Sequence, residues 1–444
     1  MDTISKRDTG EIKISPEFMY EIQKGITNIP SFQEKIEESF ENRITETLEI
    51  ILGGAITLGV SDIHIEPKKL KSRIRVRDDG MLQDVIDFNL DIYAKVVSRI
   101  KLISKLKLNI RDRPQDGRFS VALPENPGAA ISKLFMVEIR VSILPSEYGE
   151  TIVLRVLNPK KLVSFEQLGL RPDLLKLFEK EMSRPNGMVI VTGPTGSGKT
   201  TTLYAFLKKV QNSENKIITI EDPIEYHLED ISQTQVNPEK QYTFANGLRS
   251  VMRQDPDIIL VGEIRDLETA TIALQASLTG HLVFSTLHTN DAAGTIARLQ
   301  SLGENLVNIA PAINLSIAQR LVRKVCKHCK KTRKITTEEL KEIKENFKNF
   351  PKNIEKPKIN SNLKIVEPVG CKECNFTGYK GRVGIFEALL IDDEMENFIL
   401  TSPSIADLNK KAIKRGMTTI YQDGILKVLE GETTFEEVER VTGE

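Results

Sequence analysis

The sequence predicts an α/β protein whose parallel sheet is preceded by a smaller α+β domain. Before residue 157 the chain reads as short strands with turns, and after residue 186 continuous apolar strands alternate with helical segments. Strands that are buried on both faces and alternate with helices indicate a parallel sheet. A glycine-rich turn joins the first of these strands to a helix, and two CxxC pairs follow later in the chain. With 444 residues, the chain is also too long for one ordinary core.

The composition argues against a dedicated nucleic-acid-binding protein. Lysine and arginine together number 62, as do aspartate and glutamate, so the formal net charge is zero, whereas nucleic-acid binders are usually basic. No apolar run approaches the ~18 residues needed to cross a bilayer. The polar start of the sequence lacks the apolar core of a signal peptide. We therefore expect a cytoplasmic protein that reaches a membrane only through a partner or a surface helix.

We expect residues 1–45 to form a short N-terminal extension and residues 46–157 to form the α+β domain. The strand patterns of this domain are SDIHIEP, SRIRVRDDGMLQDV, RFSVALP, LFMVEIRVSILP and TIVLRVL. One helical pattern, IYAKVVSRIKLISKL, interrupts them. The DDG at residues 78–80 is typical of a hairpin turn.

The second part of the chain begins after a linker and entry helix at residues 158–186. Its apolar strands are MVIVTG, KIITIED, DIILVGE and HLVFSTLH, and helical segments such as TTLYAFLKKV and TATIALQAS lie between them. The boundaries that we predict are 187–319 for the α/β core, 320–385 for a cysteine-bearing subdomain and 386–444 for a C-terminal helical region.

The glycine-rich turn GPTGSGKTT matches the spacing of a phosphate-binding loop. MVIVT precedes it as a strand, and Leu203, Phe206, Leu207 and Val210 then give the spacing of an amphipathic helix. Glycines allow several backbone N–H groups to face phosphates at the helix N-terminus. Lys199 would place a charge on the β and γ phosphates, and Thr200 would give Mg²⁺ a hydroxyl ligand. The expected nucleotide-binding residues are Gly193, Pro194, Thr195, Gly196, Ser197, Gly198, Lys199, Thr200 and Thr201.

Acidic residues follow two further strands of the predicted sheet. Glu221 and Asp222 end IITIED, and Glu263 follows DIILVG. Because the carboxyl ends of parallel strands meet at one edge of a sheet, we expect these carboxylates near the γ-phosphate and its Mg²⁺. One carboxylate can hold the metal through water, and another can orient or deprotonate the attacking water. An acidic residue after a strand is more often a helix cap or a solvated turn, but two such sites beside a phosphate loop favour the functional interpretation.

Two of the five histidines bracket the apolar run LVFST. About seven residues of strand at ~3.3 Å each place His281 and His288 roughly 20 Å apart. His288 lies at the carboxyl edge with the phosphate loop, so we expect it to donate to a phosphate oxygen as a γ-phosphate sensor. His281 lies at the opposite end, where a structural or inter-subunit contact is expected.

All four cysteines belong to CxxC pairs, CKHC and CKEC, separated by 41 residues. Four thiolates suit a tetrahedral structural Zn²⁺, with Cys326, Cys329, Cys371 and Cys374 as ligands and a small subdomain between the two pairs. A redox dithiol is less favoured, because a redox CxxC normally opens a helix after a strand. Residues 320–334 also hold eight basic residues in fifteen. This run would form a solvated face or, alternatively, attract anionic lipid headgroups or nucleic acid.

Several long motifs together resemble the secretion ATPases of type II secretion and type IV pili, and are similar to the members that drive assembly. These motifs are SDIHIEP, RPQDGRF, GPTGSGKT, IITIEDPIEY, MRQDPDIILVGEIRD, GHLVFSTLHTN, GCKECNFTGYKGRVGIFE and DGILKVLEGETTFEEVERVTGE. The resemblance covers about residues 45–444. It implies a RecA-like ATPase domain, a smaller PAS-like domain, and a homo-hexameric ring that hydrolyses ATP with Mg²⁺.

The resemblance also implies roles for individual residues. It makes Glu221 the general base and gives Glu263 a metal–water role, although the sequence leaves open which of the two has which role. The smaller domain of this family sends arginines to the phosphates, and the matching positions here are Arg118, Arg140 and Arg155. An arginine that reaches the γ-phosphate is worth ~10³–10⁵ in rate elsewhere; the alternative for each is a surface strand residue.

The leading functional hypothesis is an ATPase motor that drives assembly of a pilus or secretion pseudopilus through an inner-membrane platform protein. A motor of the same fold for pilus retraction or type IV secretion is the alternative, against which the cysteine pairs argue. A nucleic-acid translocase is a third hypothesis, and the zero net charge and the absence of a basic–aromatic strand face argue against it. We therefore expect no obligatory nucleic acid.

Overall fold

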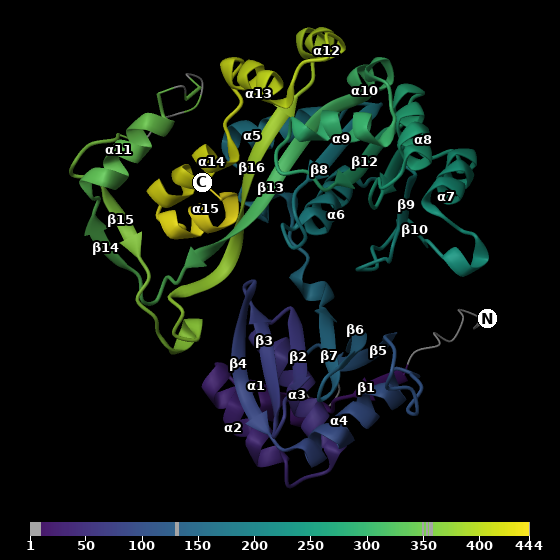
Figure 1. The fold of residues 1–444 in the computed structure, drawn as a ribbon, viewed down its shortest axis with the longest axis vertical. Helices are drawn as coiled ribbons and strands as arrows, with labels where there is room; N and C mark the ends of the chain where they lie inside the picture. Colours follow the sequence, from purple (N-terminus) through teal and green to yellow (C-terminus); the bar gives the residue numbers. More distant parts are fainter. Residues whose placement is uncertain (1–9, 129–132, 349, 352–353, 355–357, 444) are drawn as a thin grey trace. The chain divides into compact units, whose positions relative to one another are not determined.

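The chain divides into two units, which are described separately (Figure 1). The first comprises residues 1–161 and 369–380, and the second comprises residues 162–368 and 381–444. The computed structural model describes residues 10–128, 133–348, 350–351, 354 and 358–443.

The first unit contains a seven-stranded sheet in the order β1-β5-β6-β7-β2-β3-β4. Its strands are β1 (Gly10–Lys13), β2 (Asp62–Pro67), β3 (Ser72–Asp78), β4 (Met81–Phe88), β5 (Gln115–Pro124), β6 (Leu134–Ser146) and β7 (Gly149–Leu157). All neighbours are antiparallel except β1 and β5. The predicted hairpin turn between β3 and β4 is confirmed, with Asp79 and Gly80 both at positive φ.

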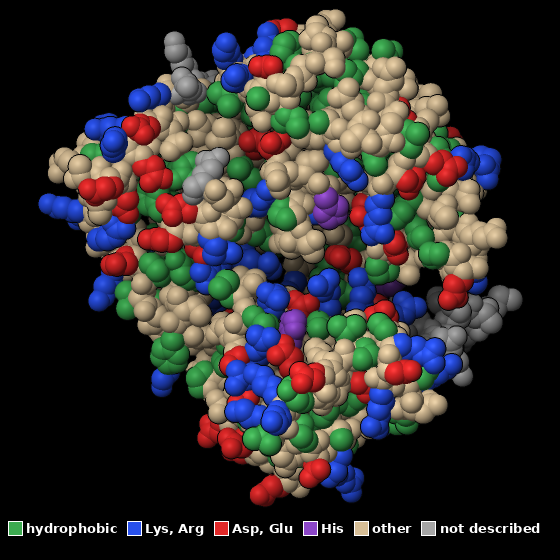
Figure 2. Space-filling view, viewed as in Figure 1, with side chains coloured by type: hydrophobic (Ala, Val, Ile, Leu, Met, Phe, Trp, Pro, Cys, Tyr) green, Lys and Arg blue, Asp and Glu red, His purple; other side chains and the backbone are tan. Residues whose placement is uncertain are grey.

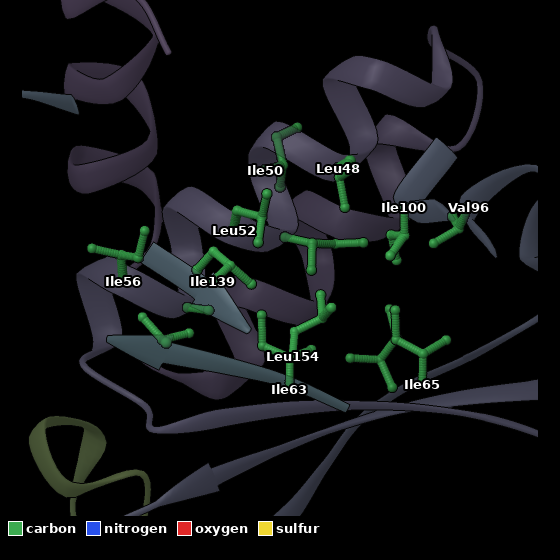
Figure 3. Packing of buried hydrophobic residues seen from close by; sticks show 14 of the residues in the cluster. Leu48, Ile50, Leu52, Ile56, Ile63, Ile65, Val96, Ile100, Ile139 and Leu154 are labelled. Atoms are coloured by element: carbon green, nitrogen blue, oxygen red, sulfur yellow. The ribbon is translucent and has the colours of Figure 1, made fainter. Parts of the chain in front are cut away.

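Four helices cover the apolar face of this sheet: α1 (Pro16–Gly25), α2 (Ile29–Ser39), α3 (Ile44–Leu58) and α4 (Leu90–Ile103). Figure 3 shows Leu48 and Leu52 of α3, with Ile100 of α4, packed against Ile63 and Leu154 of the sheet. Helices α1 and α2 fall within the stretch expected to be an N-terminal extension. Their apolar residues are nevertheless buried in the same core, so the two helices pack as part of this unit.

The second unit contains the parallel sheet that the sequence predicts. Its order is β10-β9-β11-β12-β8-β13-β16, and each pair from β10 to β13 is parallel. The strands are β8 (Gly187–Thr192), β9 (Ile217–Glu221), β10 (Ser232–Gln235), β11 (Ile258–Val261), β12 (Leu282–Leu287), β13 (Ile313–Val325) and β16 (Tyr379–Leu390). Every residue of β8 and β12 is buried, as expected for strands covered on both faces.

Helices lie on both faces of this sheet. On one face α5 (Pro172–Met182) and α6 (Lys199–Val210) pack against alternate residues such as Val189 and Phe284. On the other face the intervening residues, such as Ile190 and Val283, contact a larger group of helices. That group consists of α7 (Phe244–Val251), α8 (Leu267–Leu278), α9 (Gly294–Leu302), α10 (Leu306–Ala312), α12 (Asp393–Leu400) and α13 (Ile405–Lys414).

A third apolar cluster forms where the ends of β13 and β16 meet the C-terminal helices α14 (Ile420–Leu429) and α15 (Phe435–Thr442). The segment between the two CxxC pairs contributes β14 (Lys331–Lys334), α11 (Thr337–Asn346) and β15 (Lys364–Glu367). Strands β14 and β15 pair with each other and not with the main sheet. The segment between the cysteine pairs thus contains a helix and a two-stranded sheet, and the predicted boundaries at residues 319/320 and 385/386 fall inside strands β13 and β16.

The surface mixes charges of both signs. Figure 2 shows lysine and arginine interspersed with aspartate and glutamate over the visible face, in keeping with the balanced composition. Among the helices that the structure describes, none has the length and apolar character required to cross a bilayer.

Candidate active site at the phosphate loop

The glycine-rich turn lies between the carboxyl end of β8 and the start of α6, where the sequence predicts it. Gly198 precedes the helix at φ 89°, a left-handed conformation that glycine adopts without steric cost. Gly193 lies against β13: an added Cβ would be 2.6 Å from the carbonyl oxygen of Gln319, which is too close for any side chain. The loop conformation thus depends on glycine at both positions.

Lys199 is the first residue of α6 and bends back over the loop. Its Nζ donates to the carbonyl oxygens of Gly193 at 2.9 Å and of Pro194 at 3.1 Å. Burial lowers the pKa of the Lys199 ammonium, and the charge of Glu263 opposes that shift. The hydroxyl of Ser197 is buried with no hydrogen-bond partner among the described residues. A cation, an unpaired hydroxyl and N–H groups at a helix start fit the phosphates of a nucleotide, and Thr200 is half-buried in the same first turn.

Glu263 follows β11 and belongs to a charged cluster at the carboxyl edge of the sheet. It forms an ion pair with Nη2 of Arg265, and Nη1 of the same arginine is 3.8 Å from Asp222 Oδ2. Its Oε2 is 3.6 Å from Nε2 of His288. The negative charge of Glu263 also opposes the lowering of the Lys199 pKa. The structure therefore brings together three of the residues expected at this edge: Lys199, Glu263 and His288.

Glu221 points into the protein instead. It is buried, and its carboxylate accepts hydrogen bonds from the hydroxyls of Tyr204 and Thr219, the latter at 2.6 Å, and from Gln233 Nε2 at 3.2 Å. Burial raises the pKa of this carboxyl, although the three donors oppose the shift. Its oxygens are thus occupied by protein donors.

Glu225, four residues later in IEDPIEY, is a carboxylate that was not among the residues expected at the site. It is half-buried, and its charge, like that of Glu263, opposes the lowering of the Lys199 pKa by burial. Its N–H donates to the hydroxyl of Tyr204 at 3.3 Å. Its position in the same motif as Glu221, at the edge where the phosphate loop lies, was the signal that could have identified it.

The two histidines lie at opposite ends of β12, as predicted. Burial lowers the pKa of the His288 imidazole, and the charge of Lys199 adds to that shift, so the ring is neutral near pH 7. Nδ1 of His281 lies 3.0 Å from the carbonyl oxygen of Ala276, at the end of α8. His281 therefore makes a local structural contact.

The turn that carries His288, residues 288–293, is held by three neighbouring segments. Thr192, at the end of β8, exchanges hydrogen bonds with Thr289. Arg320 on β13 is buried and donates to the carbonyl oxygen of Asn290 at 2.9 Å. The same guanidinium lies beside the phosphate loop, 3.2 Å from where a Cβ on Gly193 would stand.

Glu387 on β16 holds the far end of this turn. The carboxylate is buried, and it accepts from the N–H of Ala292 at 2.9 Å and of Ile420, at the start of α14, at 3.3 Å. Burial raises the pKa of this carboxyl to about 7. Neither Arg320 nor Glu387 was expected at the site from sequence, because their partners lie about 30 to 95 residues away along the chain.

The three expected arginines of the first unit occur on adjacent strands of its sheet. Arg118 on β5 is directly opposite Arg140 on β6, which is directly opposite Arg155 on β7. Arg118 and Arg155 are exposed, and Arg140 is half-buried.

The four cysteines meet the geometric requirement for a metal ion. Their sulfur atoms all lie within 4.8 Å of one another. Backbone N–H groups of Cys371 and Gly378 donate to Sγ of Cys374, at 3.2 and 3.3 Å. Such donors stabilise a thiolate, the form that binds metal. The residues present therefore fit a tetrahedral ion.

Comparison with known proteins gives consistent matches over almost the whole chain. Residues 37–440 match the family model described as type II/IV secretion system protein. The "Type II secretion system ATPase E" of Vibrio cholerae is 42% identical, over 94% of this chain and 78% of that protein. The "Type IV pilus assembly ATPase PilB" of Acinetobacter baylyi is 40% identical, over 91% and 67%. Among solved structures, the pilus retraction motor PilT with bound ADP is 27% identical with a TM-score of 0.58, over 89% of this chain and 97% of that chain.

Proposed function

The chain belongs to the type II/IV secretion system protein family, and from that premise we propose that it is a homo-hexameric motor for assembly of a pilus or secretion pseudopilus. It is an ATPase of secretion or pilus assembly and binds ATP with Mg²⁺. The motor would act at the inner membrane, through a platform protein of that membrane. The four-cysteine cluster and the relatives named for secretion and pilus assembly support assembly over retraction. We also propose that the exposed lysines of the basic run at residues 320–334, namely Lys327, Lys330, Lys331 and Lys334, contact anionic lipid, whereas Arg320 is buried and cannot.

The observation that carries this proposal is the group formed by Lys199, Glu263 and His288 at one edge of a parallel sheet. The phosphate loop from Gly193 to Thr201 would hold the phosphates, and Lys199 would neutralise charge on the β and γ groups. Thr200 and Glu263 would hold Mg²⁺, Glu263 through a water molecule. Neutral His288 would donate to the γ-phosphate. In the first unit, Arg118, Arg140 and Arg155 would stabilise the charge that develops on the phosphates during hydrolysis.

We place the general base at Glu225 and not at Glu221. A base needs a free oxygen within reach of the attacking water. The oxygens of Glu221 accept from three protein donors, whereas Glu225 stands at the edge occupied by Lys199. Glu221 would then hold the segment IEDPIEY in place through its hydrogen bonds to the interior of the unit.

Replacement of the loop lysine tests the motor. Lys199→Ala should abolish measurable ATP hydrolysis, because the loop then lacks the ammonium group that would neutralise the β and γ phosphates, while the apparent Tm stays close to that of the wild type. Lys209→Ala is the matched control: this lysine is on the same helix, but it pairs with Glu166 and Glu179 away from the loop. Hydrolysis by Lys199→Ala at the wild-type rate would sink the ATPase mechanism.

We further propose that the cysteine cluster holds one structural Zn²⁺. Elemental analysis of the purified protein should find about one zinc per chain, as four thiolates require. Cys374→Ser should lose the zinc and lower the apparent Tm, whereas Ser402→Ala, outside the cluster, should retain both. A folded protein without metal and with unaltered Tm would reject this assignment.

A further inference from the structure

Two neighbouring residues of β13, Gln319 and Arg320, lie against the phosphate loop. The carbonyl oxygen of Gln319 is 2.6 Å, and Nη1 of Arg320 is 3.2 Å, from the point where a Cβ on Gly193 would stand. Oε1 of Gln319 also accepts from the hydroxyl of Thr202 in α6 at 2.8 Å. All of these residues belong to the second unit, so a single sheet and its helices determine how they lie.

The guanidinium of Arg320 also reaches the turn at residues 288–293, which carries His288. Its Nη2 donates to the carbonyl oxygen of Asn290 at 2.9 Å, and its Nη1 donates to the carbonyl oxygen of Gln319 at 3.0 Å. Arg320 thus contacts both the phosphate loop and the turn of the expected γ-phosphate sensor. Two parts of the site that are far apart in sequence meet at this one side chain.

The positive charge of Arg320 is buried without an ion pair. The residue is 9% exposed, and within the described part of the chain its guanidinium donates to carbonyl oxygens and to no carboxylate. Burial lowers the pKa of this guanidinium, and the charges of Glu387 and Asp291 oppose that shift at longer range. Because an unpaired buried charge is costly, a cation in this position is the arrangement expected where a bound anion completes the site.

Two groups of the phosphate loop indicate the same anion. The charge of Arg320 lowers the pKa of the Lys199 ammonium, so the two cations are close enough to repel each other. The buried hydroxyl of Ser197, which has no hydrogen-bond partner among the described residues, is 2.8 Å from the Cβ point on Gly193. Two cations and an unpaired hydroxyl beside one glycine are complementary to phosphate oxygens, whose negative charge would relieve the repulsion.

Arg323, three residues later on β13, has a different environment. Its backbone N–H donates to one carboxylate oxygen of Glu437 at 3.0 Å, and its Nη2 donates to the other. Glu437 is buried and belongs to α15, so this contact joins β13 to a C-terminal helix and involves no residue of the loop. Arg323 is therefore a structural arginine of the same strand, and a matched control for Arg320.

We propose that Arg320 is a positioning residue of the ATPase, which couples the phosphates in the loop to the turn that carries His288. The inference rests on the proposed function, in which the loop from Gly193 to Thr201 binds ATP. The charge of Arg320 acts on the phosphates that the loop holds, and its Nη2 holds the turn through Asn290. Bound phosphates therefore favour the conformation in which the turn is fixed beside the loop, because Arg320 interacts more favourably with that state.

The test separates the charge of Arg320 from its hydrogen bond to the turn. Arg320→Lys keeps the charge but loses the planar fork that donates to two carbonyl oxygens, whereas Arg320→Gln loses the charge and keeps an amide donor. Arg323→Lys and Arg323→Gln are the controls, and Lys199→Ala and His288→Ala are references for the proposed function. For each full-length variant one measures kcat and KM for ATP hydrolysis, the apparent Tm, and the Kd values for ADP and for a non-hydrolysable fluorescent ATP analogue.

The two substitutions of Arg320 should have different effects. Arg320→Gln should weaken binding of the ATP analogue by about five-fold or more and that of ADP by less, because the analogue carries more negative charge. Arg320→Lys should keep both Kd values within about two-fold of the wild type but lower kcat by about 10-fold or more, because the turn of His288 is no longer held in place.

The double variant Arg320→Lys/His288→Ala should have the kcat of His288→Ala alone, because a residue that acts through His288 has no further effect once that side chain is removed. A purely structural role for Arg320 does not produce this non-additivity. Arg323→Gln should lower the Tm, since Glu437 loses its partner, but both Arg323 variants should keep kcat and the Kd values within about two-fold of the wild type.

Three results would overturn the inference. In the first, both Arg320 variants keep the kcat and Kd values of the wild type while Lys199→Ala is inactive; the proposed function then stands and this inference fails alone. In the second, Arg320→Lys and His288→Ala lower kcat additively, or both Arg320 variants behave as Arg323→Gln does, which makes Arg320 a structural arginine. In the third, Lys199→Ala also hydrolyses ATP normally, and the proposed function fails together with the inference.

Discussion

At the scale of single residues, three carboxylates at or after the ends of strands β9 and β11 have different environments. Glu221 ends a buried strand and accepts three hydrogen bonds from interior side chains. The charges of Glu263 and Glu225 instead oppose the lowering of the Lys199 pKa. Three protein donors take up most of the roughly four lone-pair sites of the buried Glu221 carboxylate, so little acceptor capacity is left there for a water or a metal. Glu225 and Glu263 are partly exposed, which is why we propose them and not Glu221 for contact with the attacking water and the metal.

Amide substitutions separate these roles. Glu263→Gln and Glu225→Gln should each lower kcat by about 10²–10⁴-fold, the range for loss of an acid–base or metal-binding group, with little change in Tm. Glu221→Gln should lower kcat less but reduce stability by about 1–3 kcal/mol, because the amide leaves a buried hydroxyl or amide donor without an acceptor. Steady-state kinetics and thermal unfolding of the three variants check this. A larger kcat loss in Glu221→Gln than in the other two would contradict the assignment.

At the scale of elements, the turn after β12 is the best-connected part of the site. Thr192 ties it to the strand before the phosphate loop, Arg320 ties it to β13, and Glu387 ties it to β16 and to the start of α14. Glu387 thus accepts hydrogen bonds both from this turn and from the start of the C-terminal helix α14.

The buried Glu387 carboxyl makes stability depend on pH. Its folded-state pKa is raised to about 7, so the group favours folding below its unfolded value of 4.5, and that contribution is lost as the pH rises towards 7. The loss amounts to about 3 kcal/mol, from 1.36 kcal/mol per pKa unit. The apparent Tm of wild type should therefore fall between pH 5 and 7.5, and Glu387→Gln should flatten this dependence.

The control for this prediction is Glu304→Gln. Glu304 is also a buried glutamate of the second unit, but its carboxylate contacts Thr271 and Asn308 on the helical face and not the turn at residues 288–293. The apparent Tm of Glu304→Gln should change with pH in the same way as that of the wild type. If the apparent Tm of Glu387→Gln fell with pH as steeply as that of the wild type between pH 5 and 7.5, Glu387 would not titrate in this range.

At the scale of the whole molecule, each unit supplies one half of the proposed chemistry. The second unit carries the phosphate loop and its carboxylates, and the first carries Arg118, Arg140 and Arg155 on adjacent strands of its sheet.

The molar mass of the assembled protein in solution tests the proposed hexameric ring. In the presence of Mg²⁺ and a non-hydrolysable ATP analogue, light scattering after gel filtration should give the mass of six chains of 50.0 kDa each. Arg155→Gln and Lys199→Ala should shift the balance towards smaller species, because each lacks a contact to the phosphates. Wild-type protein that stays a single chain at all concentrations, with nucleotide bound, would contradict the hexamer.

Local patterns in the sequence were sufficient for much of this protein. Strand and helix periodicities predicted most strands of the first sheet, the four central strands of the parallel sheet, the hairpin at residues 78–80 and the phosphate loop, because each depends on residues close in sequence. The rule that parallel strands end at one edge was enough to predict that Lys199, Glu263 and His288 lie together. The paired CxxC motifs likewise indicated a four-thiol cluster.

Tertiary structure alone decided the rest. Whether Glu221 faces inward depends on Tyr204 and Gln233, which come from a helix and from the edge strand of the sheet. Arg320 and Glu387 both contact the turn at residues 288–293, and this depends on the order of the strands in the sheet. Strand register decides that Asp62 lies directly opposite Arg155 and Arg77. Order and register are set by how a whole core packs, so no short stretch of sequence contains them.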